Sequence, residues 1–440
     1  MTPKAIFFND ALRLTAELLH RHAFPGKVRP LVIRDLHGRI RIALENANKE
    51  KHSELASQLS KGIEKLAAFA GEKGKSVLFP EDFFDPDNIF QHPDILDFYF
   101  PGTERPLRLL DRLVVGQDWL RPLADRAEGA VPRLVFFGLK GGVGRSTALA
   151  MLAYDLARSG KRVLLIDFDL ESPGLSGLLL PPDRLNDFGM VDWFVEDAVG
   201  QEEAVLDRMV SVSPLSEHTQ GEIRVAAAMG LGEKFYLAKL SRVFADVPHQ
   251  GSLEHFSQRA NRLLTALEAR EKPDVVLIDS RAGLHDLAAV SIVGLASHAF
   301  MFAVDSAQTW QGYRLLFSQW QVYPSVLKAV RDRLVMVEAL FPESDQAGRA
   351  ERFLENVYTL FSETIYEQIE PDKPADPEVF NFDMRDTDAP HYPLRIKWNN
   401  RFQEFDPLLL PKGILTEADV AATFGDFIEG VKRILGGGGA

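Results

Sequence analysis

Six apolar runs of strand length lie between residues 133 and 341, and stretches with helical spacing separate several of them. Strands that are apolar on both faces and joined by crossover helices predict a mostly parallel sheet with helices on both faces, which is an α/β fold. Ligands of such sheets bind beyond the carboxyl ends of the strands, so functional residues are expected directly after these runs. The runs are RLVFFG, RVLLIDFD, IRVAAAM, DVVLIDS, HAFMFAV and RLVMVEALF, and the helical stretches are 146–159, 254–270 and 310–330.

The first 128 residues have a different pattern. Residues 5–22 have helical spacing, two apolar runs within 27–45 flank DLHG as in a hairpin, and residues 47–72 predict an amphipathic helix. Residues 79–105 are rich in Pro, Asp and Phe, which predicts a loop or docking segment. We therefore predict a smaller α+β accessory domain over 1–128 and the α/β domain with a C-terminal extension over 129–440.

Composition narrows the function classes. The 440 residues carry a net charge of -13, which argues against a protein that mainly wraps a phosphate backbone. The chain has no cysteine, so disulfides and thiol chemistry are excluded. The uncharged run 287–304 is interpreted as a buried helix entering a core strand and not as a membrane span. Without a signal-peptide pattern at the N-terminus, a cytoplasmic location is expected.

A glycine-rich loop follows the first run of the α/β region and precedes a helix. Glycines let backbone amides turn inward around an anion, and the helix N-terminus adds unpaired amides. The loop therefore predicts a phosphate-binding site, with the Ser146 hydroxyl placed to meet Mg²⁺. The residues of the loop are Lys140, Gly141, Gly142, Val143, Gly144, Arg145, Ser146 and Thr147.

Aspartates end two of the predicted strands. Asp167 and Asp169 lie at the end of RVLLIDFD, and Asp279 is the next-to-last residue of DVVLIDS. Carboxylates that face a polyphosphate are costly unless a cation lies between, so Asp167 and Asp279 are predicted to hold Mg²⁺ together with Ser146. Asp169 is predicted to orient an attacking water. The alternative for each aspartate is a cap at the end of a strand.

These motifs resemble those of the MinD/ParA-type P-loop ATPases, a SIMIBI-class family. LKGGVGRST is similar to the family's deviant Walker A, VLLIDFDLESPGL to its second strand and switch I, and PDVVLIDSRAG to its Walker B and switch II, over residues 133 to about 340. The resemblance implies an ATPase that uses ATP and Mg²⁺. It also implies a nucleotide-sandwiched homodimer in which Lys140 reaches the partner subunit's phosphates, and a Gly283 amide that meets the γ-phosphate.

Arg145 departs from the family pattern, which has lysine at this position. Arginine keeps the charge but differs from lysine in length and planarity, and the two are not interchangeable. Three readings stay open: an ATP-hydrolysing switch that is slow or activated by a partner, a nucleotide-gated binding module with negligible hydrolysis, and a small-molecule ligase or kinase. A DNA-associated positioning ATPase is a further alternative, which the acidic balance weakens.

Outside these motifs the sequence is less specific. The accessory domain is expected to bind a protein partner or effector that the switch regulates. Residues 304–317 could meet base or ribose, although an ordinary loop and helix start is favoured. The segment 385–409 is interpreted as a surface loop, and the GGGGA end as a flexible or added tail. The amphipathic helix within 416–440 has an acidic polar face, so it is expected to pack on its own domain and not on a membrane.

Overall fold

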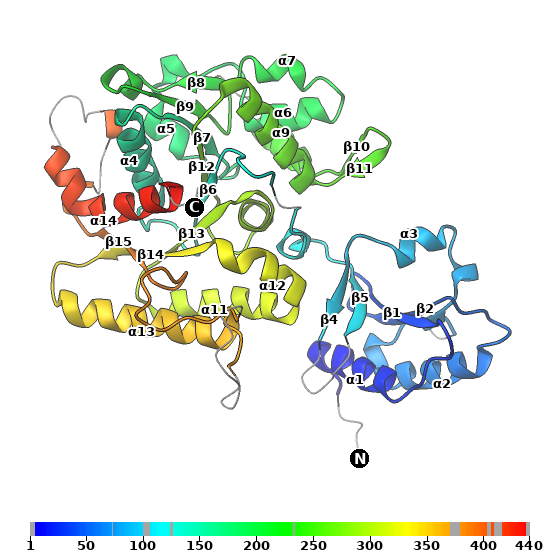
Figure 1. Cartoon of the computed structure of the whole chain (residues 1–440). Coiled ribbons are helices and arrows are strands. Elements are labelled where there is room, and N and C mark those ends of the chain that lie inside the picture. The colour runs from blue at the N-terminus through cyan, green and yellow to red at the C-terminus, as the bar shows by residue number, and fades with distance from the viewer. Residues whose placement is uncertain are drawn as a thin grey trace. The chain divides into compact units, whose positions relative to one another are not determined.

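The computed structural model describes residues 5–72, 74–99, 106–123, 126–231, 234–369, 379–402, 406–408 and 416–436. The chain forms two compact units. The first comprises Met1–Arg121 with Ser318–Lys328, and the second comprises Pro122–Phe317 with Ala329–Ala440. Figure 1 labels most of the helices and strands of both units. The last four residues of the predicted GGGGA tail, 437–440, lie outside the described residues.

The first unit contains a sheet with the strand order β3-β2-β1-β5-β4. The predicted hairpin is confirmed, since β1 and β2 pair antiparallel, whereas β1 and β5 pair in parallel. Leu31, Ala43 and Leu110 of the sheet bury their side chains together with Phe90. The strands are β1 (Arg29–Arg34), β2 (Ile40–Glu45), β3 (Val77–Leu78), β4 (Ile95–Phe98) and β5 (Leu107–Asp111).

The helices of the first unit correct one expectation. Within 79–105, predicted as a loop, the structure has α3 (Pro86–Phe90) and β4, because Phe90 and Phe98 are buried. Residues 100–105 lie outside the described residues. The predicted helix within 47–72 is shorter than the pattern suggested, α2 (Ser53–Glu64), and it packs on α1 (Phe8–His20).

The second unit contains an eight-stranded sheet with the order β15-β14-β13-β6-β12-β7-β9-β8. All its neighbouring strands pair in parallel except β8 and β9, which confirms the predicted mostly parallel α/β fold. A separate hairpin joins β10 (Val247–His249) to β11 (Ser252–Glu254). The sheet strands are β6 (Arg133–Gly138), β7 (Arg162–Asp167), β8 (Val210–Val212), β9 (Glu222–Ala226), β12 (Val275–Asp279), β13 (His298–Ala303), β14 (Leu334–Phe341) and β15 (Leu394–Lys397).

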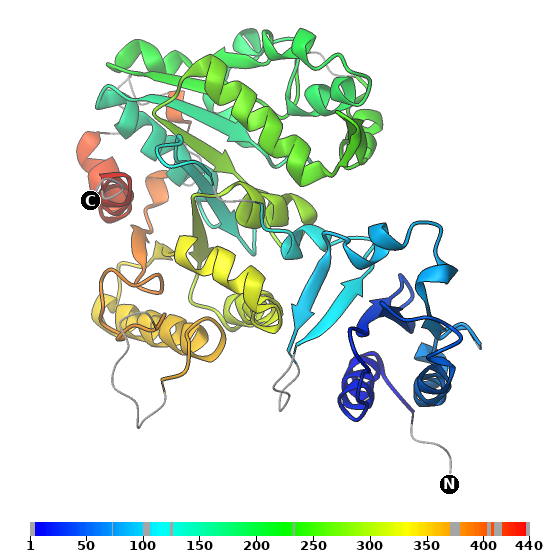
Figure 2. The ribbon, with the colours of Figure 1, turned by 45° about the vertical axis from the view of Figure 1, so that its right-hand side comes forward.

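Helices cover both faces of this sheet, as Figures 1 and 2 show. On one face, α4 (Arg145–Arg158), α5 (Leu175–Leu179) and α14 (Glu417–Gly436) pack on a core that contains Phe136 and Phe427. On the other face, Phe137 contacts Tyr313 of α11 (Ala307–Val322), and α9 (Phe256–Glu271) packs nearby. Successive residues of β6 therefore serve opposite layers, as a doubly covered strand requires.

The remaining elements of the chain are short, apart from one long helix. The helices are α6 (Met190–Asp197), α7 (Glu203–Leu206), α8 (Tyr236–Val243), α10 (Asp286–Ala289), α12 (Pro324–Val330) and α13 (Gln346–Thr364). Single 3₁₀ turns cover Ala67–Phe69, Pro80–Asp82, Gln117–Leu120, Pro182–Arg184, Pro214–His218, Arg331–Arg333 and Asn400–Phe402.

Two more expectations are corrected. The predicted helix 310–330 is divided into α11 and α12 before Pro324, because proline lacks the N–H that an uninterrupted helix needs. The segment 385–409, predicted as a surface loop, contains β15, which pairs with β14 and buries Ile396. A strand of four residues is too short for its alternation to stand out in the sequence.

Two predicted helices are confirmed. The uncharged run 287–304 forms the end of α10 and a π-helical turn, Val290–Leu295, before it enters β13. The C-terminal helix α14 packs against β15 and α4 of its own unit. Within the described residues, every helix is too short or too polar to cross a bilayer.

Candidate functional site

The glycine loop has the backbone that its sequence predicts. Gly142 and Gly144 have φ values of 77° and 76°, a left-handed conformation that favours glycine. A Cβ atom at Gly142 would meet nothing within 4 Å, so the requirement there is conformational and not steric. Helix α4 begins at Arg145 with Gly144 as its N-cap, so the first amides of the helix, which have no acceptor within the helix, lie at the loop. The loop therefore combines turned glycines with a helix N-terminus, which is the arrangement that binds phosphate.

Asp279 connects the loop to the ends of the strands. One carboxylate oxygen accepts a hydrogen bond from Ser146 Oγ at 2.6 Å, and the other accepts one from Arg145 Nε at 2.5 Å. The sheet register places Asp279 opposite Asp167 of β7. Asp169, two residues later, lies 3.8 Å from Arg145 Nη2. The structure thus brings Arg145, Ser146 and all three predicted aspartates together at the carboxyl end of the sheet.

Asp167 is the carboxylate of this group whose charged form is least favoured by its surroundings. Its side chain is fully buried, and burial together with the nearby charge of Asp279 raises its pKa to about 7. Oδ2 accepts hydrogen bonds from the Ser176 amide and hydroxyl at 3.0 and 2.8 Å. Oδ1 has no hydrogen-bond partner in the described structure. A buried carboxylate oxygen without a donor is suited to a cation.

Asp169 is less buried than Asp167, and burial raises its pKa while Arg145 opposes the shift. Its Oδ1 accepts a hydrogen bond from the Ser172 amide at 3.2 Å, which helps to orient the carboxylate. Asp169 is 8% exposed, against 0% for Asp167 and 2% for Asp279, so it is the most accessible of the three aspartates to a ligand or water.

The fit of the site to Mg²⁺ can be judged from its donors. Within the described part of the chain, no three acidic or histidine side chains converge closely enough to hold a metal ion themselves. Mg²⁺ prefers oxygen ligands and commonly takes one or two protein oxygens, with water and substrate phosphates completing the shell. Ser146, Asp167 and Asp279 offer oxygens of that kind, so the residues fit Mg²⁺ that is bound together with a nucleotide.

Two predicted phosphate contacts have protein partners in this structure. Lys140 is exposed, and its Nζ donates a hydrogen bond to the side chain of Gln308 at the start of α11. The Gly283 amide donates to the Gly138 carbonyl at 3.1 Å. Each group would have to exchange its partner to meet a phosphate. Val143 and Thr147 lie in the loop with Val143 buried, so Val143 can contribute only its backbone to a ligand.

The structure adds residues that sequence reasoning missed. Ser176 holds Asp167, and its position nine residues after that aspartate gave no recognisable spacing. Gln308, which binds Lys140, lies in the stretch 304–317, for which the sequence favours an ordinary loop and helix start. Arg281 lies 4.0 Å from Asp169, and its place in the segment PDVVLIDSRAG, two residues after Asp279, is the signal in the sequence that could have identified it.

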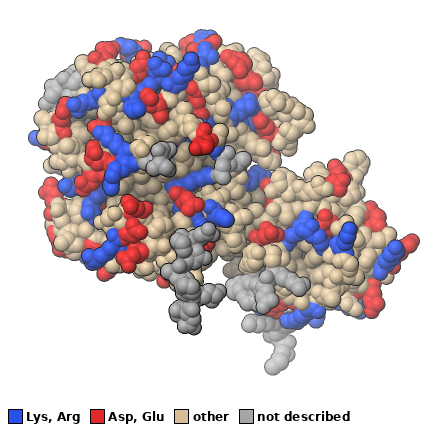
Figure 3. Space-filling view, in the orientation of Figure 1, with Lys and Arg blue, Asp and Glu red and all other residues tan. Residues whose placement is uncertain are grey.

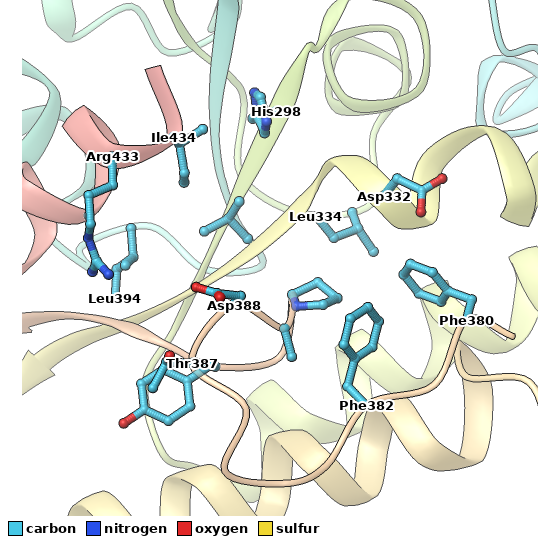
Figure 4. A pocket seen from close by; sticks show the side chains of 15 residues that line it. His298, Asp332, Leu334, Phe380, Phe382, Thr387, Asp388, Leu394, Arg433 and Ile434 are labelled. Atoms are coloured by element: carbon cyan, nitrogen blue, oxygen red, sulfur yellow. The ribbon is translucent and has the colours of Figure 1, made fainter. Parts of the chain in front are cut away.

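A cavity lies at the opposite end of the same sheet. The cavity of about 410 Å³ lies where β13 and β14 begin, and none of the predicted site residues lines it. Figure 4 shows Phe380 and Phe382 on one side and Arg433 of α14 on the other. Burial, with help from Arg333, lowers the pKa of His298 in its wall. The cavity therefore belongs to a different region from the glycine loop.

Charges of both signs are mixed on the surface. Figure 3 shows Lys and Arg interspersed with Asp and Glu over the visible face of each unit. A nucleic-acid backbone is usually met by a continuous basic patch, and this face does not present one.

Comparisons with solved structures find weak likenesses over most of the chain. A ParA family ATPase from Chlorobium tepidum TLS has 14% identity and a TM-score of 0.41, with 68% of this chain and 99% of that chain covered. MinD from Pyrococcus horikoshii OT3, complexed with Mg-ADP, has 17% identity and a TM-score of 0.41, with 70% and 98% covered. Cobyrinic acid a,c-diamide synthase from Mycobacterium smegmatis, with a bound ATP analog and magnesium, has 17% identity and a TM-score of 0.37, with 55% and 86% covered.

A comparison with curated proteins finds no match. The family of the CobQ/CobB/MinD/ParA nucleotide binding domain matches residues 134–365, which is more than half of the chain and includes the glycine loop and the aspartates described above. The chain therefore belongs to the CobQ/CobB/MinD/ParA nucleotide-binding family.

Proposed function

We propose that the chain is a Mg²⁺-dependent ATPase switch that hydrolyses ATP through a nucleotide-sandwiched homodimer and so regulates a partner. The observation that carries this proposal is the convergence of the glycine loop with Ser146, Asp167, Asp169 and Asp279 at the carboxyl end of β6, β7 and β12. ATP is preferred to GTP because of the family resemblance. The alternative of a ligase or kinase has less support, since an acceptor site was not found in the sequence.

Each residue then has a role that follows from its position. The amides of Gly141–Thr147 bind the phosphates, and Ser146, Asp167 and Asp279 hold Mg²⁺ directly or through water. When bound, Mg²⁺ neutralises the negative charge that builds up on the phosphate oxygens. Asp169 accepts a hydrogen bond from the attacking water and orients it. The Gly283 amide exchanges its hydrogen bond with the Gly138 carbonyl for one with the terminal phosphate.

Arg145 supports a second candidate function. Its guanidinium already binds Asp279 and approaches Asp169, so part of its charge is used inside the protein. An arginine held in this way follows the moving phosphate charge less easily than a lysine. A nucleotide-gated binding module with negligible hydrolysis is therefore the alternative to a working ATPase, and turnover separates the two.

Lys140 is the basis for the proposed homodimer. Its side chain is exposed and held by Gln308 of its own subunit, away from the Asp279 cluster. We propose that ATP-bound subunits pair and that Lys140 then leaves Gln308 for the phosphates of the partner subunit. Gln308 would thus keep the lysine extended before the subunits meet.

The partner protein is proposed to bind the accessory domain. We propose that this domain comprises residues 1–128 and that the nucleotide-binding domain with its extension comprises 129–440. Phe84, in the segment predicted for docking, is fully exposed. Limited proteolysis of the full chain tests the boundary, with cleavage expected between residues 121 and 131. The DNA-associated alternative predicts salt-dependent DNA binding in the presence of ATP.

The experiment that tests the homodimer mixes two inactive variants. Lys140→Ala lacks the cation supplied to the partner, and Asp169→Ala lacks the water-orienting carboxylate of its own site. A mixed dimer has one complete site, formed by Asp169 of one subunit and Lys140 of the other. If the variants mix randomly, phosphate release should recover to about a quarter of the wild-type rate.

Three outcomes separate the candidates. Recovery of phosphate release on mixing supports the sandwiched dimer. A mixture that releases no more phosphate than the two variants do separately means that Lys140 acts within its own subunit, and it overturns the dimer proposal. Wild-type protein that binds Mg·ATP but releases no more phosphate than Asp169→Ala is a binding module. Phosphate release should also rise faster than linearly with protein concentration.

A further inference from the structure

Two loops beside the proposed nucleotide site are joined by a carboxylate to which no role has been assigned. Glu171 follows β7, and Arg281 and His285 follow β12. Arg281 Nη1 lies 2.5 Å from one oxygen of Glu171, and His285 Nε2 lies 3.0 Å from the other. Both oxygens of Glu171 therefore face the loop after β12. We call this set of three residues the Glu171 bridge.

The His285 side of the bridge is fixed. Nδ1 accepts a hydrogen bond from the Leu287 amide at 3.3 Å, so a neutral ring carries its proton on Nε2, which faces Glu171. The ring also packs edge-on against Phe244, with centroids 6.2 Å apart. His285 is thus the N-cap of α10, and these contacts hold its side chain in place.

The Arg281 side differs because it borders the site. Arg281 lies two residues after Asp279 and two before Gly283, and its Nη1 is also 4.0 Å from Asp169. Arg145 approaches Asp169 from another direction, at 3.8 Å. The Arg281 side chain is 26% exposed, which leaves room for it to turn. Two arginines therefore flank Asp169, and the charge of one of them is balanced by Glu171.

We propose that Arg281 changes its partner with the nucleotide state: it holds Glu171 when the site is empty and contacts the terminal phosphate of a bound nucleoside triphosphate. The exchange releases the loop after β7 from the loop after β12, so that the triphosphate changes the surface beside the site. This inference rests on the proposed function, because it requires the site to bind nucleotide. Glu171 competes with the third phosphate only, so a diphosphate should leave the bridge closed.

The test compares Mg²⁺-bound AMP-PNP with Mg²⁺-bound ADP by calorimetry on the full-length protein. Glu171→Gln removes the competing charge, and we expect AMP-PNP affinity to rise roughly threefold to tenfold with ADP affinity unchanged. Arg281→Gln should lower AMP-PNP affinity about tenfold and leave ADP affinity unchanged. The double variant should behave like Arg281→Gln, because Glu171 acts only through Arg281.

A matched control is Glu217→Gln. It breaks an exposed ion pair away from the site, in which Glu217 lies 3.1 Å from Arg184, and it should alter neither the AMP-PNP nor the ADP affinity. A second measurement needs no ligand. Hydrogen exchange of the amides in residues 170–176 should become faster in nucleotide-free Glu171→Gln than in the wild type, because the bridge holds this loop. Arg281→Lys should keep part of the preference for AMP-PNP over ADP that Arg281→Gln loses.

The outcomes distinguish this inference from the proposed function. A wild-type protein that binds neither nucleotide overturns both. A protein that binds both nucleotides, with the same AMP-PNP to ADP ratio in Glu171→Gln as in the wild type, overturns the partner exchange alone, even if hydrogen exchange becomes faster. In that case the bridge only stabilises the two loops.

Discussion

Buried carboxylates in the first unit are neutralised differently from those at the candidate site of the second. Asp94 accepts two hydrogen bonds from the Arg121 guanidinium, both of 2.6 Å, and both oxygens of Asp111 are bound by Arg34. Asp167 is more deeply buried, and among the described residues no arginine pairs with it and one of its oxygens has no donor. The structural carboxylates Asp94 and Asp111 are therefore neutralised by arginine side chains, whereas Asp167 keeps an oxygen that is available to a bound cation.

The difference concerns the site and not the unit as a whole. Asp197 of the second unit is also buried, and Arg259 and Arg262 donate to its two oxygens at 2.7 and 2.8 Å. Within the described residues, the cluster of Asp167, Asp169 and Asp279 accepts one hydrogen bond from an arginine, from Arg145 to Asp279. Asp169 has two arginines nearby, Arg145 at 3.8 Å and Arg281 at 4.0 Å, but neither pairs with Asp167 in the described structure. A buried carboxylate that no arginine neutralises, as at Asp167, therefore indicates a ligand site more specifically than a buried acid by itself does.

The largest expected effect comes from breaking a structural pair. Arg259→Met should lower the free energy of unfolding by about 3–5 kcal/mol, because it leaves Asp197 with less neutralisation and the carbonyls of Phe194, Val243 and Ala245 without their donor. Urea unfolding measures the loss. The control Arg262→Met, at a side chain 24% exposed, should cost clearly less. Equal losses would contradict the assignment of Arg259 as the principal partner.

The corresponding change in the first unit is Arg34→Met. It removes both hydrogen bonds to Asp111, and we expect a loss of about 3 kcal/mol. Hydrogen exchange should become faster in β1 and β5, the two strands that carry the pair. Arg29→Met, at a side chain 62% exposed and 3.9 Å from Glu45, is the control and should be almost neutral. A loss spread evenly over both units would contradict local action.

At the site, removing a charge should stabilise the ligand-free protein. The pKa of Asp167 is raised from 3.8 to about 7, so the folded protein keeps its proton more tightly than the unfolded chain does. This group therefore makes stability fall as pH rises from about 4 to about 7. Asp167→Asn should gain roughly 2 kcal/mol at pH 8, gain little at pH 4, and abolish Mg²⁺-dependent nucleotide binding.

Thermal unfolding of wild type and Asp167→Asn at pH 4, 6 and 8 measures this dependence. A gain that is the same at all three values would show that the cost of Asp167 is not the cost of its charge. A destabilised variant at pH 8 would contradict the comparison with Asp94 and Asp111 directly.

The smallest effect concerns the two donors that Asp167 does have. Ser176→Ala removes the hydroxyl bond of 2.8 Å and keeps the amide bond, so the carboxylate should cost about 1 kcal/mol more at pH 8. In the Asp167→Asn background the same substitution should cost less, because a charged acceptor no longer loses its donor. A double-mutant cycle by chemical unfolding compares the two.

The comparison also separates local signals from long-range ones. By itself the sequence determined the glycine loop, the parallel strands around it, the hairpin of β1 and β2, and the buried helix before β13. Periodicity and turn chemistry are local properties, so they could be read directly. The same signals failed for β15 and for the segment that contains β4, where short strands become ordered only through their neighbours in a sheet.

The tertiary structure alone decided how the charges are matched. Lys140 meets Gln308 across 168 positions, Arg145 meets Asp279 across 134, and Arg259 meets Asp197 across 62. The choice of Glu171 as the bridge between two loops depends on β7 lying beside β12 in the sheet. Local patterns identify which residues carry charge, but the strand order sets the distances between them, and those distances decide which charges are neutralised.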